Sequence, residues 1–188
     1  DCTTRGAVIG GTSAGLAVMG EFIYDPDGIA GITSAEALAD PYDPFMTLST
    51  DFLRFPIMDS IITDSHFHAR DRMGRTLAFM ARLRQDGSAP QITALAIDEQ
   101  TSLFIDRDGV GVVDNNGSGA VYVVSERADT QRAQVSPGLP LIYRNLQRIR
   151  VDAGRFYNFV TRQHNGIDST ISVDGGNAAA PFTPTDPY

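Results

Sequence analysis

The sequence predicts an α/β fold, in which a mostly parallel sheet is flanked by helices and followed by an antiparallel, β-rich C-terminal part. Two observations support this. Short apolar runs alternate with helical patterns up to residue 98, and closely spaced strand patterns separated by turn residues follow. The 188 residues, 42% of them hydrophobic, suffice for one domain with a substantial core. We therefore expect a single domain over residues 1–177.

The first elements are a strand, a sharp turn and a helix in immediate succession. Residues 6–11 (GAVIGG) form an apolar run that ends in glycines, and residues 12–15 (TSAG) form the turn. A helix of small residues is expected to start at Ala14. Residues 24–51 contain several Asp-Pro and Asp-Gly pairs, which indicate a loop.

Two further apolar runs flank the strongest helical pattern. Residues 58–63 (MDSIIT) and residues 92–98 (ITALAID) are typical of buried strands. The helix between them is expected over residues 70–84, with Asp64 or Ser65 as its cap.

Beyond residue 100 the pattern changes to short strands. Asp108-Gly109 is a hairpin signal. Strands are expected over residues 103–105, 110–113, 120–125, 147–151 and 170–173. Residues 178–188 are rich in Ala, Pro and Thr without periodicity, so we expect a loosely held tail there.

Charge and composition exclude several classes of function. The formal net charge of −8 does not attract a phosphate backbone, so nucleic acid is not expected as a partner. No apolar run has the length of a membrane span. The single cysteine, Cys2, rules out an internal disulfide but leaves a bond to another chain open. The sequence does not open with a signal-peptide pattern. A processed, mature chain would also lack this pattern, and we favour a secreted or periplasmic location.

Residues 11–15 match the pattern G-x-S-x-G. In serine hydrolases this pattern places the nucleophile on a tight turn between a strand and a helix, so that Ser13 Oγ would project from the sheet edge. The backbone N–H of Ala14 is placed to donate to a developing oxyanion. The alternative is a glycine-rich turn that only packs the helix on the strand or cradles a phosphate, and the short motif alone does not separate the two.

A nucleophilic serine needs a base and an acid that orients it. His66 follows one predicted strand and Glu99 follows the next, so both lie where α/β sites form. The second-ranked choice is His164 with Asp114 or Asp152, although no buried strand precedes His164.

His66 and His68 also suggest a pair of metal ligands. The spacing of further ligands does not support this, so neither a metal nor a cofactor is expected.

Three arginines follow His66 on the predicted helix: Arg70, Arg72 and Arg75. Such charges usually mark a solvated helix surface. Their position also suits a clamp for substrate carboxylates, since guanidinium binds a carboxylate through two parallel hydrogen bonds.

Three blocks of this sequence, in the same order, resemble the cyanophycinase family of serine peptidases, which is related to aspartyl dipeptidase. Residues 5–15 resemble its nucleophile elbow. Residues 64–75 resemble its D-Q-H-F…R-x-R-x-G-R block, and residues 96–101 its G-I-D-E-x-T segment. The chain departs from the family at Ser65, where glutamine is usual, and at Leu16, where alanine is usual.

The resemblance implies a class I glutamine amidotransferase-like fold and cleavage of cyanophycin into β-Asp-Arg dipeptides. It implies Ser13 as nucleophile, His66 as base and Glu99 as orienting acid. Asp64 and the three arginines would line the substrate pocket.

The resemblance also implies that the N-terminal half of the domain is missing from this chain. We therefore expect a companion chain that carries this half, because the apolar strands need sheet neighbours and helices on both faces. A homo-oligomer stays open. Two other functions remain alternatives: a dipeptidase or amidase acting on another substrate, and a catalytically idle structural subunit.

Overall fold

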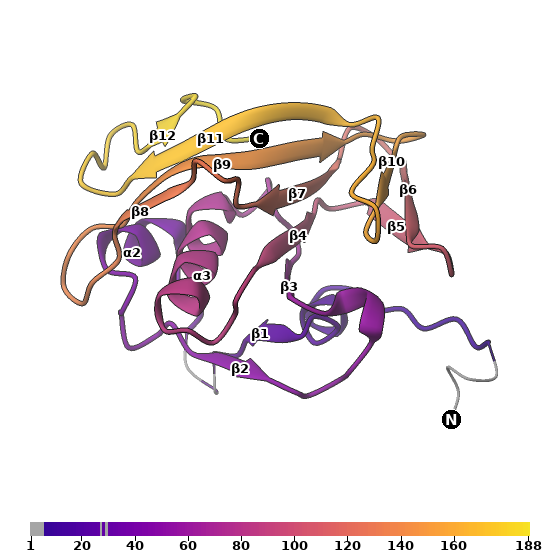
Figure 1. The fold of residues 1–188 in the computed structure, drawn as a ribbon, viewed down its shortest axis with the longest axis horizontal. Coiled ribbons are helices and arrows are strands. Elements are labelled where there is room, and N and C mark those ends of the chain that lie inside the picture. Colours follow the sequence, from indigo (N-terminus) through magenta and orange to yellow (C-terminus); the bar gives the residue numbers. More distant parts are fainter. Residues whose placement is uncertain (1–5, 27, 29) are drawn as a thin grey trace.

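The computed structural model describes residues 6–26, 28 and 30–188 (Figure 1). Cys2, for which the sequence left a bond to another chain open, lies outside these residues. The helices are α1 (Ala14–Ala17), α2 (Ser34–Ala39), the 3-10 helix η1 (Pro56–Met58) and α3 (Met73–Gln85). None of the helices in the described ranges is long and apolar enough to cross a bilayer.

The larger sheet is mixed. Its strands in chain order are β1 (Phe22–Tyr24), β2 (Leu48–Thr50), β3 (Ile61–Asp64), β4 (Thr93–Ile97), β7 (Val121–Ser125), β8 (Gln131–Gln134), β9 (Ile142–Val151), β11 (Ile167–Asp174) and β12 (Phe182–Thr183). They lie in the order β12-β11-β9-β7-β4-β3-β1-β2, with β8 paired to β9. A second sheet has the order β10-β6-β5, formed by β5 (Thr101–Ile105), β6 (Val110–Asn115) and β10 (Phe156–Asn158).

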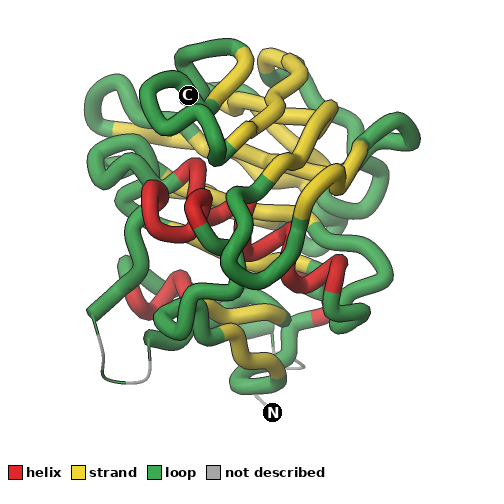
Figure 2. The backbone as a smooth tube through the Cα atoms, turned by 90° about the vertical axis from the view of Figure 1, so that its left-hand side faces the viewer, coloured by secondary structure: helices red, strands yellow, loops and turns green. Residues whose placement is uncertain are grey.

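The prediction of a mostly parallel sheet is wrong. Between described strands, only the pairs β1–β3 and β3–β4 are parallel. A parallel pair needs a long crossover, and α3 provides one between β3 and β4. The strands after β4 return through the β5–β6 hairpin and short turns, and they pair antiparallel. The neighbouring strands β1, β3 and β4 are therefore parallel, the strands on either side of them are antiparallel, and strands make up more of the described chain than helices do (Figure 2).

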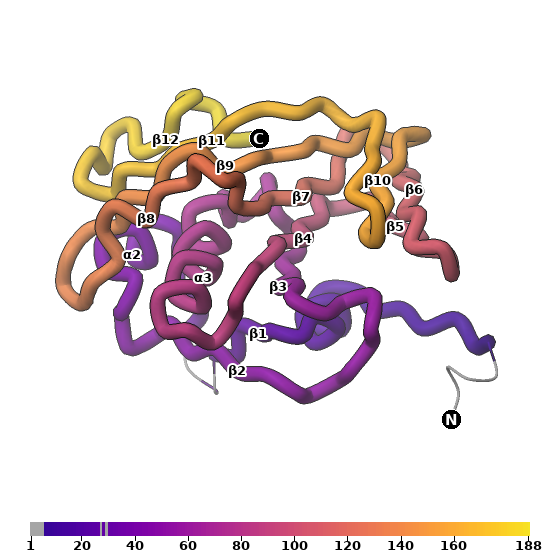
Figure 3. Tube along the Cα trace, in the orientation of Figure 1, coloured from indigo at the N-terminus to yellow at the C-terminus, as the bar shows by residue number. Residues whose placement is uncertain are grey.

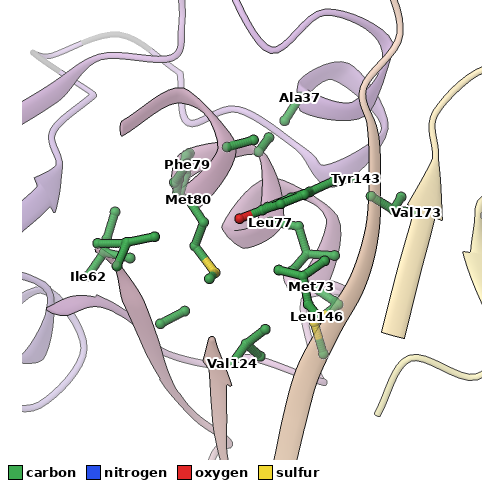
Figure 4. Close-up of a cluster of buried hydrophobic side chains, with 14 of the residues drawn as sticks. Ala37, Ile62, Met73, Leu77, Phe79, Met80, Val124, Tyr143, Leu146 and Val173 are labelled. Carbon is green, nitrogen blue, oxygen red and sulfur yellow. The ribbon is translucent and has the colours of Figure 1, made fainter. Parts of the chain in front are cut away.

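The central strands of the sheet, β3, β4 and β7, are buried on both faces. On one face α3 packs with α2 against alternate side chains of the strands, which include Ile62, Val124 and Leu146 (Figure 4). On the other face Ile61, Leu95 and neighbouring side chains pack against α1 and the second sheet. Strands buried on both faces explain the continuous apolar runs in the sequence.

The strand expected within residues 6–11 is not formed. These residues have no strand assignment, and Val8 is 83% exposed. The segment extends away from the body of the molecule (Figure 3). An apolar run becomes a strand only when another strand pairs with it, and no described strand does so here.

The region expected as a loop, residues 24–51, contains α2 and β2. The signal for this helix is a capping box: the Thr33 side chain accepts from the Glu36 N–H, and the Glu36 carboxylate accepts from the Thr33 N–H. Neither Asp64 nor Ser65 caps α3, whose N-cap residue is Arg72 and makes no side-chain capping hydrogen bond.

The expected loose tail, residues 178–188, makes specific contacts. Within it β12 pairs with β11, Pro187 is buried, and Tyr188 packs against the core on the α3 face. These contacts join residues far apart in sequence, so local composition does not reveal them.

Candidate active site

Two parallel neighbours of the sheet place the candidate base and acid. β3 and β4 pair from Ile61 opposite Thr93 to Asp64 opposite Ala96. His66 follows β3 and Glu99 follows β4, so both leave the same edge of the sheet.

Ser13 lies on a turn with unusual backbone geometry. Its φ is 52° and its ψ is −118°, and α1 starts at the next residue. A side chain on Gly11 would overlap the Gly15 carbonyl, so glycine is required on this side of the turn. The Thr63 hydroxyl of β3 donates to the carbonyls of Leu16 (2.9 Å) and Ala17 (3.2 Å), which holds α1 on the sheet.

The three side chains form a continuous hydrogen-bonded chain. His66 Nε2 lies 3.0 Å from Ser13 Oγ, and His66 Nδ1 lies 2.7 Å from Glu99 Oε1. The imidazole is 26% exposed and the carboxylate 48%. With Nδ1–H donating to Glu99, the free electron pair of Nε2 faces the serine hydroxyl, as general-base chemistry requires.

The neighbouring backbone fixes the spacing between His66 and Glu99. The Phe67 N–H donates to the Ile97 carbonyl at 3.2 Å, and the His68 N–H donates to Asp98 Oδ1 at 2.9 Å. Asp98 Oδ2 accepts from the Ala120 N–H at 2.9 Å. The buried Asp98 carboxylate thus joins the turn after β3 to the ends of β4 and β7.

A cavity of about 1280 Å³ opens in front of these residues. Ser13, His66 and Glu99 contribute to its lining, together with apolar side chains such as Phe55 and Leu103. A concave site with an apolar wall and a few convergent polar groups is typical of ligand binding.

His164 lies elsewhere. Its ring stacks on Tyr157 with centroids 6.0 Å apart, and its Nδ1 is buried without a hydrogen-bond partner in the structure. Asp152 pairs with Arg150 at 2.8 Å. The structure therefore brings His66, and not the second-ranked His164, to Ser13. In the described part of the chain, His, Cys, Asp and Glu do not gather in a group of three able to hold a metal ion.

No family model matches the chain, but several curated proteins are similar to it. The cyanophycinase of Trichormus variabilis is 33% identical over 139 residues, which cover 74% of this chain and 41% of the relative. The cyanophycinase of Geminocystis herdmanii is 32% identical over 157 residues, covering 82% and 51%. That of Synechococcus elongatus is 31% identical over 157 residues, covering 84% and 44%.

The chain belongs to a cyanophycinase-like family. It spans about half the length of the curated cyanophycinases it matches.

In this cyanophycinase-like chain, Asp64 is the centre of a buried ion-pair cluster and is 4% exposed. Arg75 donates to both carboxylate oxygens, from Nε at 2.8 Å and from Nη2 at 2.6 Å. Arg72 Nη1 donates to Asp64 Oδ1 at 3.1 Å and to the Ser65 carbonyl at 2.6 Å. Burial lowers the pKa of Arg72, an effect that the Asp64 charge opposes.

The acid and the three arginines that were expected in the substrate pocket do not line the cavity. Asp64, Arg70, Arg72 and Arg75 are all absent from the described residues that line it, although Ser65 is present. Arg70 is exposed, and its guanidinium makes no hydrogen bond or ion pair with the described residues. Of the three arginines, Arg70 is thus the one whose charge is not paired with any described residue.

Sequence reasoning missed two groups that support the site. Thr63 and Asp98 hold α1 and the turn after β3 in place, and both are buried polar residues at or beside the ends of apolar runs. A buried polar side chain needs a hydrogen-bond partner, and this is the signal that identifies them.

Proposed function

We propose that this chain carries the nucleophile, base and orienting acid of a serine peptidase that acts on cyanophycin or related β-aspartyl peptides. The observation that carries the proposal is the continuous chain of hydrogen bonds Ser13–His66–Glu99 in the lining of the cavity.

In the first half of the reaction Ser13 Oγ attacks the scissile carbonyl while His66 Nε2 takes the hydroxyl proton. Glu99 accepts from Nδ1–H and stabilises the resulting imidazolium. The carbonyl oxygen becomes an oxyanion, to which the Ala14 N–H donates. When the C–N bond breaks, His66 returns the proton to the leaving amine and an ester on Ser13 remains.

In the second half a water molecule attacks this ester. His66 Nε2 takes one proton from the water, the C–O bond to Ser13 breaks, and the proton passes to Ser13 Oγ. The enzyme is restored and the product leaves as a carboxylic acid. The exposure of Ser13 and the partial exposure of His66 allow water to reach both groups.

The proposed substrate follows from the name of the relatives and from the sequence blocks that resemble their family. β-Asp-Arg units carry free carboxylates, which a guanidinium recognises. We propose that Arg70 makes this contact with a part of the substrate that extends beyond the cavity, because Arg70 lies outside the cavity lining and its charge is unpaired within the described residues. The cluster of Asp64, Arg72 and Arg75 would then fix the shape of the turn and present Ser65 to the cavity.

We further propose that residues 7–10 pair with a strand from a companion, either another segment of a longer protein or a separate chain. The support is an exposed apolar segment beside the cavity and the greater length of the relatives. Such a companion would complete the sheet edge and the wall of the cavity.

The proposal is tested by incubating the purified protein with cyanophycin and measuring dipeptide release by mass spectrometry. We expect β-Asp-Arg from the wild type, none from Ser13→Ala, and normal release from Ser88→Ala, an exposed serine away from the site. Hydrolysis of other β-aspartyl peptides or amides without cyanophycin cleavage would point to the dipeptidase or amidase alternative. Inactivity on every substrate, with the companion present, would point to an idle subunit.

A further inference from the structure

We propose that Tyr188 is a positioning residue for His66. This rests on the proposed function, in which His66 is the base. Tyr188 does not touch His66 itself. It contacts the turn that carries it, residues 66–73, from a position more than 110 residues further along the chain.

Tyr188 holds this turn at both ends. Its ring stacks on His68, with centroids 4.4 Å apart and an interplanar angle of 19°. It also meets the ring of Phe67, which is completely buried, edge to face at 5.5 Å. The Tyr188 hydroxyl donates to Asp71 Oδ1 at 3.0 Å and accepts from the Met73 N–H at 3.1 Å. One side chain thus contacts the turn from just after His66 to the start of α3.

Tyr188 is itself anchored to the sheet. Arg148 of β9, which is buried, donates from Nη1 to the Tyr188 carbonyl at 3.0 Å and from Nε to Ser169 Oγ at 3.0 Å. The ring also lies edge to face against Tyr122 of β7 at 6.0 Å. Burial raises the pKa of Tyr188, so its hydroxyl remains a proton donor to Asp71 at neutral pH. The contact therefore joins the turn to the antiparallel half of the sheet.

The contact reaches His66 through the backbone. His66 has φ 49°, a left-handed conformation that a non-glycine residue keeps only when its surroundings enforce it. On the C-terminal side of His66, the Phe67 and His68 N–H groups bond to Ile97 and Asp98, next to Glu99. The Tyr188 ring packs against the side chains of these same two residues, Phe67 and His68. Without it, the turn has fewer contacts that oppose rotation of His66 out of line with Ser13 and Glu99.

The test compares three variants in the complete protein: Tyr188→Ala, Tyr188→Phe and Phe182→Ala. Tyr188→Phe keeps the ring contacts and loses only the two hydroxyl bonds. Phe182 belongs to the same end of the chain and packs on the core, but among the described residues no side-chain hydrogen bond or ring–ring contact joins it to residues 66–73, so it is the matched control. Measured quantities are kcat, KM, thermal stability and amide hydrogen exchange of residues 66–73.

For Tyr188→Ala we expect kcat to fall about 10- to 100-fold, the range that a small misplacement of a catalytic group produces, with KM changed less than about twofold. Exchange within residues 66–73 should become faster. Tyr188→Phe should retain kcat within about threefold. Phe182→Ala should lower thermal stability and leave kcat unchanged.

Three results would overturn the proposal. The first is unchanged exchange of residues 66–73 in Tyr188→Ala, and the second is faster exchange there with unchanged kcat. The third is an equal loss of kcat in Tyr188→Ala and Phe182→Ala, which would indicate general destabilisation. Exchange is measured without substrate, so it tests the clamp even if the wild type proves inactive. Wild-type inactivity would instead count against the proposed function.

Discussion

The two sides of the candidate site are supported very differently. His66 and Glu99 follow β3 and β4, whose side chains are buried on both faces. Ser13 follows residues 6–11, which are exposed and unpaired among the described strands. The two sides are linked by two hydrogen bonds from the Thr63 hydroxyl to α1 and by the packing of Leu16 against the sheet.

The contrast shows which part of the site this chain determines by itself. The base and the acid are held by the core of the sheet and by the buried carboxylate of Asp98. The nucleophile is held by the local geometry of its turn, and the segment before it pairs with no strand among the described residues. We infer that His66 and Glu99 keep their positions independently, whereas Ser13 depends on what pairs with residues 7–10.

The largest expected effect on activity concerns His66, in the part of the site that β3 and β4 hold. His66→Ala should lower kcat by about 10⁴- to 10⁶-fold, as loss of one member of a serine triad does, because no other described histidine reaches Ser13. The measurement is steady-state kinetics of dipeptide release, with circular dichroism to show that the fold is intact. A loss of less than tenfold would mean that another group serves as the base.

Amide hydrogen exchange tests whether the exposed segment before Ser13, residues 7–10, pairs with a companion strand. If a companion strand pairs with residues 7–10, their amides should exchange at least about a thousandfold more slowly than unpaired amides, as in core strands. Residues 52–54, an exposed stretch after β2 whose backbone N–H groups make no hydrogen bond with the described residues, provide the fast-exchanging control in the same protein. Equally fast exchange of the two segments would contradict the pairing proposal.

The buried cluster behind the turn is expected to contribute mainly stability. Asp64→Ala leaves Arg72 and Arg75 without their shared partner, which should reduce the free energy of unfolding by about 3–5 kcal/mol. The control is Arg54→Ala, which breaks an exposed pair with Asp51 and should change it by less than about 0.5 kcal/mol. Similar values from chemical denaturation for both variants would show that the cluster does not stabilise the fold.

The smallest expected effect concerns Arg70. Arg70→Ala should raise KM for a substrate with free carboxylates about tenfold and leave KM for a neutral ester unchanged, because the lost contact is specific to charge. Arg144→Ala, which removes an exposed arginine outside the lining of the cavity, is the control and should leave KM for both substrates unchanged. If both substrates respond alike to Arg70→Ala, Arg70 is not the carboxylate contact.

Much of the sheet was accessible from the sequence, because a strand buried on both faces is a continuous apolar run. The positions of β3, β4 and β7 follow from such runs, and β3 and β4 place His66 and Glu99. The sequence also contains the capping-box pattern of Thr33 and Glu36, which indicates a helix start at α2. The Asp-Pro pairs on both sides of it favoured a loop assignment instead.

The direction of the strands and the contacts between residues far apart in the chain could not be predicted from local sequence patterns. Local periodicity does not distinguish a parallel from an antiparallel neighbour, so the mixed sheet was missed. Tyr188 lies in a stretch without periodicity, and its contacts with His68 and Asp71 arise only from the tertiary fold. Segment 7–10 shows the converse: it has the composition of a strand but no described partner.

Our central claim is that His66 and Glu99 activate Ser13 as a nucleophile. It is tested most directly with a phosphonofluoridate, from which an activated serine oxygen displaces fluoride and forms a stable P–O bond. Intact mass and peptide mapping locate the adduct. We expect one adduct, on Ser13, formed rapidly in the wild type, about a thousandfold more slowly in Glu99→Gln, and absent in Ser13→Ala. An adduct on another serine, or equal labelling rates in the wild type and Glu99→Gln, would contradict the claim.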